Sequence, residues 1–372
     1  MDEKIKVLQV VGAMYPGGLE NFIMNLYEHI DRDKVDFDFV VHDRKDGDHC
    51  PRIEELGGKV YVLPRLTSHP FENLRKLKSL VKENHYDIVS RHTANALVVP
   101  QLLAAKKAGA LTICHSHNET DPKRVLHYLG RLFMNRACDV KIACSPKAGY
   151  WMYGKKASFR VVNNAIDIKQ FAYSSENEYA IRKEFHVEDA HLYGHIANFI
   201  ESKNHMYLLE IFKKIIENDS KAMCFCVGEG DLRPTIEAKI KELGIGEKVI
   251  LTGIRKDIPK FLSAFDCLVF PSVFEGLPVT LIEAQAAGLP MIISDTITKE
   301  VEVTEGLIFR ESIDVEPQIW AKRCIELASV ETSKDIQRVT QTELITEHGY
   351  EINTLARWYE NFFEEKVMGD IG

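Results

Sequence analysis

The chain alternates short apolar runs with longer stretches in which apolar residues recur at helical spacing. The first run, IKVLQVV at 5–11, is followed by a glycine-rich stretch and then by LENFIMNLYEHI at 19–30, an order that predicts strand, loop and helix. Further buried strands are predicted at 37–42, 60–64, 86–92, 111–117 and 140–145, with helical spacing at 70–84 and 96–109. Strands that alternate with helices predict a parallel sheet covered on both faces.

The same pattern restarts after residue 165. New apolar runs at 191–199, 222–230, 248–253, 267–272 and 290–295 alternate with helical stretches such as 206–218 and 234–244. The chain length of 372 residues also favours two domains. We therefore predict an α/β protein of two doubly wound, Rossmann-like domains, 1–165 and 166–350. An aromatic-rich helix at about 351–372 is expected to pack back on the first domain, and a ligand cleft is expected where the carboxyl ends of the strands meet.

Composition narrows the class of protein. Hydrophobic residues make up 45% of the chain and charged residues 27%, which is typical of a globular protein. The start, MDEKIKV, does not resemble a signal peptide, and no apolar run approaches the roughly 20 residues of a membrane span. A cytoplasmic location is therefore expected. The eight cysteines contain no CxxC pair and are expected to be free, mostly buried thiols.

Charge is distributed unevenly. Residues 1–170 carry a net charge of +6 and the remainder carries −14, within a total of −8. The basic half predicts contact with something anionic, such as a phosphate-bearing acceptor or a membrane surface, although plain solvated surface explains it equally well. Two basic amphipathic stretches, at 72–84 and 121–136, carry much of this charge and could lie on the anionic inner leaflet or be ordinary surface helices. No basic-aromatic motif indicates nucleic acid.

The segment SVFEGLPVTLIEAQAAGLP, at 272–290, joins two apolar runs. Pro278 suits the first turn of a helix and Gly288 suits its end, so a helix is predicted at about 278–287. The N–H groups that start such a helix favour an anion, and Gly276 allows close approach to the backbone. Glu275 and Glu283 can accept hydroxyl groups of one extended ligand. Alternatively, Glu275 caps the helix and Glu283 is ordinary surface.

The segment from 265 to 295 resembles the Glu–seven-residue–Glu signature of retaining glycosyltransferases of GT-B fold, in the family-four, glycosyl transferase group 1 class. The resemblance extends over nearly the whole chain. It implies that Glu275 contacts the donor sugar and Glu283 the ribose hydroxyls. The backbone of Gly276 and Leu277, with Val279 nearby, is then expected to hold the diphosphate.

Other segments resemble the same class. ESKNHMYLLEIF implies that Lys203 holds the donor phosphates, and TGIRKDIP places the base beside Gly253, Ile254 and Arg255. Two departures stand out. Ala165 replaces the usual glycine of an Asn-Gly-Ile-Asp turn, and Asn198 stands where the family has the Arg of Gly-Arg-Phe. Asn198 supplies no charge for the leaving group, so another cation, with Arg255 as one guess, is needed for fast turnover.

The first domain supplies further candidates. Gly17 and Gly18 resemble the family's Gly-Gly loop, which faces the donor phosphate and the acceptor. His115 and His117 end a strand on one side. They suggest a metal pair, but no third ligand lies nearby in sequence, so no metal site is predicted. The resemblance assigns one His here to the sugar hydroxyls, and counting from Gly109 favours His117. His92 lines the same cleft or is structural.

The Asp-x-Asp pair at 36 and 38 mimics a metal motif, but its alternating pattern is typical of a solvated strand edge. The resemblance implies a retaining, metal-independent hexosyltransferase without a cofactor. Its donor is a nucleotide-diphosphate sugar, with UDP as the expected nucleotide, and its acceptor is a glycan or lipid-linked hydroxyl. Within this class, the chain resembles the bacterial transferases of capsular polysaccharide and exopolysaccharide assembly. Glu275, His117 and Lys203 are the expected catalytic residues. The alternatives are a non-catalytic donor-binding partner subunit, motivated by Asn198, and a nucleotide-sugar epimerase.

Overall fold

A computed structural model describes residues 4–15, 17–45, 48–118, 121–329, 338 and 340–369. Contacts divide them into two compact units, the first running to Ile166 and resuming at Gly349, the second running from Asp167 to His348. Residues 1–3 of the expected first domain and 370–372 of the expected C-terminal helix lie outside the described residues.

The first unit contains a seven-stranded parallel sheet with the order β3-β2-β1-β4-β5-β6-β7. Its strands are β1 (Ile5–Val10), β2 (Val35–Val41), β3 (Val60–Val62), β4 (Ile88–Thr93), β5 (Leu111–Ser116), β6 (Val140–Ala143) and β7 (Arg160–Val161). Its helices are α1 (Gly18–His29), α2 (Cys50–Glu55), α3 (Pro70–Asn84), η1 (Ala96–Val98), α4 (Val99–Lys106), α5 (Arg124–Ala137), α6 (Pro146–Tyr153) and α16 (Ile352–Met368).

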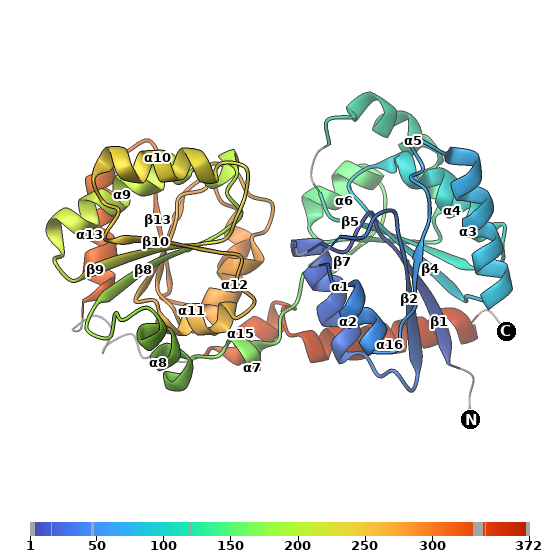
Figure 1. Ribbon diagram of the computed structural model, residues 1–372. Coiled ribbons are helices and arrows are strands. Elements are labelled where there is room, and N and C mark those ends of the chain that lie inside the picture. The colour runs from blue at the N-terminus through green and yellow to red at the C-terminus, as the bar shows by residue number, and fades with distance from the viewer. Residues whose placement is uncertain are drawn as a thin grey trace. The chain divides into compact units, whose positions relative to one another are not determined.

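Helices cover both faces of this sheet because side chains of a strand alternate between its faces (Figure 1). On one face, Val7 and Phe37 pack with α1 and with Phe363 of α16. On the other face, Leu8 and Val10 pack with α3 and α4. Helix α16 begins where the chain returns from the second unit, and the Ile352 N–H donates to the carbonyl of Ile166 over 3.0 Å.

The second unit contains a six-stranded parallel sheet with the order β10-β9-β8-β11-β12-β13. Its strands are β8 (His191–Ile196), β9 (Ala222–Val227), β10 (Val249–Gly253), β11 (Cys267–Phe270), β12 (Met291–Ser294) and β13 (Ile308–Glu311). Its helices are α7 (Ile168–Phe171), α8 (Ser175–Glu184), η2 (Glu201–Lys203), α9 (His205–Asn218), α10 (Arg233–Leu243), α11 (Ile258–Ala264), α12 (Val279–Ala286), η3 (Lys299–Val301), α13 (Pro317–Ala328) and α15 (Thr342–Glu347).

The structure bears on the expectations for the cysteines, for Ala165 and for the Asp-x-Asp pair. Seven of the eight cysteines are buried, as expected. Ala165 is buried and is not among the described non-glycine residues with positive φ, so this turn does not require the glycine that the family usually has. Strand β2 lies inside the sheet, so the description of 36–38 as a strand edge is wrong. Asp38 accepts hydrogen bonds from the Tyr86 hydroxyl and the Lys59 N–H.

Among the described residues, we found no helix with both the length and the apolar content that a bilayer crossing requires.

Candidate active site

The candidate residues of the second unit lie where the strand order of its sheet reverses. Strands β8, β9 and β10 extend to one side of this point, and β11, β12 and β13 extend to the other. Open parallel sheets bind ligands beyond the carboxyl ends of the two strands that flank such a reversal. Asn198 and Lys203 follow β8, and Glu275 follows β11, so the fold brings these residues to the favoured edge.

Lys203 and Glu275 form a direct ion pair. The Lys203 Nζ lies 2.5 Å from the Glu275 Oε1, and the two side chains are only 17% and 11% exposed. The Lys203 ammonium also lies 5.4 Å from the centre of the Phe270 ring. Since both charges are largely removed from water, each depends on the other or on a ligand for compensation.

Backbone contacts hold these two loops together. Asn204, which has a left-handed φ of 56°, donates from its side-chain amide to the carbonyl of Pro271 over 3.2 Å. The Val273 N–H donates to the carbonyl of Ser202 over 2.9 Å. The positions of Lys203 and Glu275 are therefore fixed by bonds on both sides of the pair. Asn tolerates this backbone conformation better than most residues, so Asn204 is a site residue that the sequence motifs did not indicate.

The loop before α12 leaves open space beside its glycine. A Cβ added to Gly276 would meet no atom within 4 Å. The residue before the helix, Pro278, makes no side-chain cap, and α12 begins at Val279 rather than at Pro278. The Glu275 carboxylate accepts from Lys203, and none of the described N–H groups of α12 donates to it, so the alternative role as a helix cap is wrong. The first N–H groups of α12 are available to an anion beside Leu277.

The carboxyl group of Glu283 is partly removed from water, which disfavours its charged form. It is half-buried, and no hydrogen bond or ion pair connects its side chain to another described residue. Burial raises its pKa from 4.5 to about 7. A carboxylate desolvated in this way gains from a ligand that donates hydroxyl groups to it. Glu283 is thus more than ordinary surface.

The turn after β10 contains an arginine that is already paired with two carboxylates. Gly253 has a φ of 73°, and Ile254 is 72% exposed. The Arg255 guanidinium binds Glu184 at 2.7 Å and Asp257 at 2.8 Å. Two carboxylates already neutralise Arg255, so to replace the missing cation it would have to leave both of them, and that role stays a prediction. Asn198 is exposed, and its side chain supplies no charge in place of the family's arginine.

The first unit repeats this arrangement at its own reversal, between β1 and β4. Gly17 precedes α1, Gly18 begins it, and His92 lies on β4. A Cβ added to Gly17 would lie 2.7 Å from the Glu20 Oε2, whereas one added to Gly18 would meet nothing within 4 Å. A side chain at position 17 would therefore displace Glu20.

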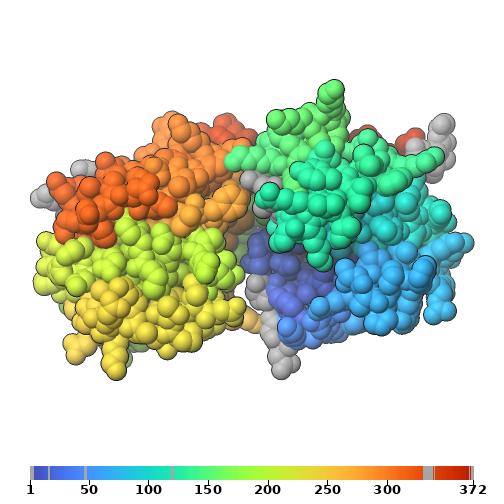
Figure 2. Space-filling view, turned by 90° about the horizontal axis from the view of Figure 1, so that it is seen from above, coloured from blue at the N-terminus to red at the C-terminus, as the bar shows by residue number. Residues whose placement is uncertain are grey.

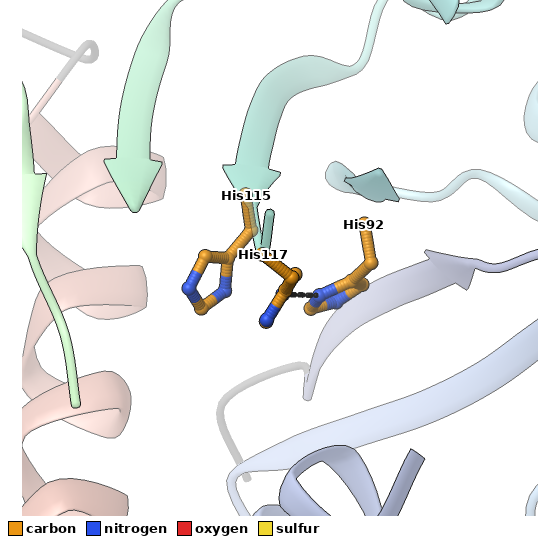
Figure 3. Close-up of side chains that lie close together, drawn as sticks. All are labelled: His92, His115 and His117. Atoms are coloured by element: carbon orange, nitrogen blue, oxygen red, sulfur yellow. Dashed lines mark hydrogen bonds between the residues drawn. The ribbon is translucent and has the colours of Figure 1, made fainter. Parts of the chain in front are cut away.

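Three histidines converge beside this loop (Figure 3). His92 and His115 are direct partners in the β4–β5 register, and His117 follows two residues later on the same side. The ring centres of His115 and His117 are 4.0 Å apart, and Phe22 of α1 packs against both rings. Burial lowers the pKa of all three, that of His117 to about 3, so the imidazoles are neutral.

A hydrogen-bonded chain orients His117. The Gln9 Oε1 lies 2.8 Å from the His92 Nε2, and the His92 Nδ1 lies 3.0 Å from the His117 Nε2. With Gln9 accepting, His92 donates from Nε2 and accepts at Nδ1, so the His117 Nε2 carries a proton. Among the described residues, the His117 Nδ1 then has no hydrogen-bond donor, and both ring nitrogens of His115 also have no partner. Such atoms are free to bind a ligand.

The same atoms have the geometry of a metal group. One nitrogen from each of His92, His115 and His117 lies within 4.8 Å of the others. Neutral imidazole nitrogens are common ligands of zinc and related ions. The sequence shows no third ligand near His115 and His117, but the strand register supplies one in His92. Hydroxyl groups of a sugar are the alternative partners of these nitrogens.

Two parallel sheets, each with helices on both faces (Figure 1) and candidate residues at its reversal point, are the architecture of the GT-B fold. Solved structures share it. Anabaena HepE in complex with UDP and glucose aligns with a TM-score of 0.79 at 19% identity over 97% of this chain and 99% of that chain. A glycosyltransferase from Rickettsia africae aligns with a TM-score of 0.80 at 17% identity over 98% and 99%. The chain has the GT-B fold.

Sequence comparison identifies the family. Residues 190–329 match the model for glycosyl transferases group 1, and residues 16–170 match glycosyltransferase family 4. EpsF of Bacillus subtilis (strain 168), named as a glycosyltransferase, is 32% identical over 365 residues, covering 93% of each chain. CapH of Staphylococcus aureus, named as a capsular polysaccharide biosynthesis glycosyltransferase, is 24% identical and covers 87% of this chain and 91% of its own. The chain belongs to the glycosyl transferase group 1, family 4 class.

Proposed function

We propose that the protein is a retaining, metal-independent glycosyltransferase of polysaccharide biosynthesis. It moves a hexose or N-acetylhexosamine from UDP to a hydroxyl of a glycan or lipid-linked acceptor. The observation that carries the proposal is the partly buried Lys203–Glu275 pair at the sheet reversal, with the unpartnered Glu283 on the following helix. Together they offer one cation and two carboxylates to a ligand that has phosphates and hydroxyls.

Each group takes one part of the donor in this proposal. Lys203 exchanges its partner Glu275 for the diphosphate, whose charge also meets the N–H groups of Gly276, Leu277 and Val279. Glu275, once released, accepts a hydroxyl of the transferred sugar. Glu283 accepts the ribose hydroxyls, which gives its carboxylate the partners that the free protein lacks. The backbone of Gly253, Ile254 and Arg255 lies beside the base.

His117 is proposed to stabilise the sugar as the donor bond breaks. Its unpartnered Nδ1 is an acceptor for a sugar hydroxyl, and its low pKa keeps the ring neutral at working pH. A neutral ring suits a position near a sugar that gains positive character during transfer, because it adds no like charge. His92 and Gln9 act as positioning residues through the chain of hydrogen bonds.

The reaction exchanges one bond for another on the same face of the sugar. The bond between the anomeric carbon and the diphosphate oxygen breaks, and UDP leaves with the electron pair. The acceptor oxygen then forms its bond from the side that UDP has left, and its proton passes to the departing phosphate oxygen. The anomeric configuration is retained. Lys203 and backbone amides neutralise the leaving group in this scheme, so no metal is required.

The nature of the acceptor is supported by relatives. A galactosyltransferase of Escherichia coli, named for UDP-galactose and a diphosphoundecaprenol-linked sugar, is 24% identical over 78% of this chain and 80% of its own. A lipid-linked acceptor would bring the enzyme to the cytoplasmic face of a membrane as a peripheral protein.

A thermal-shift panel of UDP, GDP and ADP, run with EDTA, tests the donor site. A ligand that binds only the folded protein adds about 2.7 kcal/mol at about 100-fold excess over its Kd. We expect a shift with UDP alone, and none in a Lys203→Ala variant. A shift with GDP or ADP instead of UDP would identify that nucleotide as the one in the donor. No shift with any of the three nucleotides would contradict the proposal.

Asn198 favours a second candidate, a donor-binding partner subunit without activity of its own. Its position lacks the family's positive charge, and Arg255 is already paired with Glu184 and Asp257. In that case UDP would bind normally, but UDP-sugar would remain intact with every acceptor. Turnover by the purified wild-type protein would exclude this candidate. Conversion of the donor sugar without any acceptor would instead indicate an epimerase.

A further inference from the structure

Helix α5 presents an apolar stripe that no part of the described chain covers. Val125, Leu126, Leu129, Leu132 and Phe133 recur at helical spacing and are between 52% and 77% exposed. These five residues, called here the outer stripe, form one contiguous face because positions three and four apart lie together. Single exposed apolar residues are normal in proteins, but five on one face of one helix mark an interaction site.

The opposite face of α5 is firmly anchored. His127 is buried, accepts the Ala96 N–H at Nδ1 over 3.1 Å and lies 3.0 Å from the Trp151 carbonyl through Nε2. Its ring stacks on Trp151 with centres 3.9 Å apart. A Cβ on Gly130 would lie 2.5 Å from the Ala96 carbonyl oxygen, so the helix approaches η1 closely. The helix cannot roll inward to bury the outer stripe without breaking these contacts.

The charged residues of α5 itself and its N-cap residue are all basic. Lys123, Arg124, Arg131 and Arg136 lie on or beside α5, and no acidic residue occurs from 122 to 138. Exposed Lys155 and Lys156 follow Gly154, where an added Cβ would lie 3.7 Å from the Arg131 Cζ. An apolar face bordered by cations is complementary to an anionic bilayer, whose headgroups attract the cations while the acyl region accepts the apolar side chains.

The helix also lies where a bilayer could reach it. Within the first unit α5 is an outermost helix (Figure 1). Figure 2, seen from above that view, shows its green-cyan atoms on the surface nearest the viewer.

We propose that the outer stripe of α5, with its flanking cations, is the surface by which this protein lies on an anionic membrane. The proposal deepens the proposed function and rests on its lipid-linked acceptor. The helix axis lies parallel to the bilayer, with Leu129 and Leu132 inserted at the headgroup boundary. A protein partner or a second copy of the chain would use the same apolar stripe but would not require anionic lipid.

Vesicle co-sedimentation of the full chain tests this surface. The vesicles contain phosphatidylcholine alone or with about one third phosphatidylglycerol, and salt is raised from about 0.1 M to about 1 M to shorten the Debye length from about 10 Å to about 3 Å. We expect binding to the anionic vesicles that falls at high salt, and at least about tenfold weaker binding after Leu129→Glu with Leu132→Glu. Tyr179→Glu with Ile319→Glu, at exposed apolar sites of the second unit, is the matched control and should bind like wild type.

A second pair of variants separates charge from apolar contact. Lys123→Gln with Arg136→Gln should lose the preference for anionic vesicles. Wild-type protein that stays in the supernatant, or a Leu129/Leu132 variant that binds as well as the control, would overturn the proposal. So would a wild-type dimer, seen by sedimentation, that dissociates in the Leu129/Leu132 variant. The UDP thermal shift of every variant should equal that of wild type, so failure of membrane binding is distinguishable from failure of the donor site.

Discussion

Replacing Glu283 by glutamine removes a charge that the folded protein holds at a cost. Burial raises the pKa of Glu283 from 4.5 to about 7. At about 1.4 kcal/mol per pKa unit, the ionised carboxylate destabilises the folded state by about 3 kcal/mol. Below pH 4.5 both folded and unfolded chains are protonated at this group and the cost is absent. Between 4.5 and 7 only the unfolded chain loses its proton, so stability falls as pH rises.

Glutamine resembles the protonated acid at every pH. The Glu283→Gln variant should therefore match wild type near pH 4 and be more stable by about 3 kcal/mol at pH 8, which corresponds to roughly 5–10 °C in Tm. It should also bind UDP about tenfold more weakly, because a neutral hydrogen bond is worth less than a charge-assisted one. Stability and donor affinity move in opposite directions, as expected of a residue kept for binding.

The assay is thermal unfolding of wild type, Glu283→Gln and the control Glu347→Gln at both pH values, without nucleotide, followed by UDP titration. Glu347 is an exposed residue of the same unit, and its replacement should change neither quantity. A Glu283→Gln variant that is no more stable at pH 8, or whose advantage is the same at pH 4, would refute the burial argument. Unchanged UDP affinity would refute the ribose contact.

Three further predictions concern the remaining site residues. Asn198→Arg should restore the positive charge beside the leaving diphosphate. Turnover in a UDP-release assay should then rise by about tenfold or more, on the scale of about 1.5–3 kcal/mol for a charged hydrogen bond. An unchanged rate would show that position 198 is not next to the diphosphate. His117→Ala should lower kcat by about 100-fold with little change in UDP affinity. His92→Phe removes only the positioning contact and should lower kcat less. If UDP affinity in His117→Ala fell as much as kcat, a role of His117 at the sugar would be contradicted. EDTA treatment should leave turnover unchanged, whereas a loss that a divalent ion restores would assign His92, His115 and His117 to a metal.

Periodicity predicted the architecture because most strands of both sheets are short and largely apolar, and most of their residues are buried. The 70–84 stretch forms α3 with the same bounds, and 206–218 falls within α9. Strands β7 and β13 were missed for a physical reason. The first is only two residues long and exposed, and the second, IFRE, is half-buried throughout, so neither has a buried apolar run.

The contact between Lys203 and Glu275 could not be predicted from the sequence. Family resemblance selected Lys203 and Glu275, but only the fold shows that they form an ion pair, because the contacts of Asn204 and Val273 join loops about 70 residues apart.

His92 was expected as a cleft or structural residue but not as the third member of the histidine group, because His92 and His115 are neighbours in strand register, not in sequence. Aligning the two predicted strands, 86–92 and 111–117, in parallel would have placed His92 beside the histidine pair. The pairing of Arg255 with Glu184 carried no sequence signal, since Glu184 lies far from Arg255 along the chain, whereas its second partner, Asp257, is only two residues away.

The assignment of Lys203 and Glu275 to the donor site is tested most directly by UDP release from UDP-sugars with a lipid-linked sugar acceptor, comparing wild type with Lys203→Ala and Glu275→Ala. Each variant should lose at least about 100-fold in turnover, because each removes a group that stabilises the separating charges. The double variant should lose less than the product of the two, because the residues contact each other. Near-normal turnover in both single variants would contradict the assignment of the donor site.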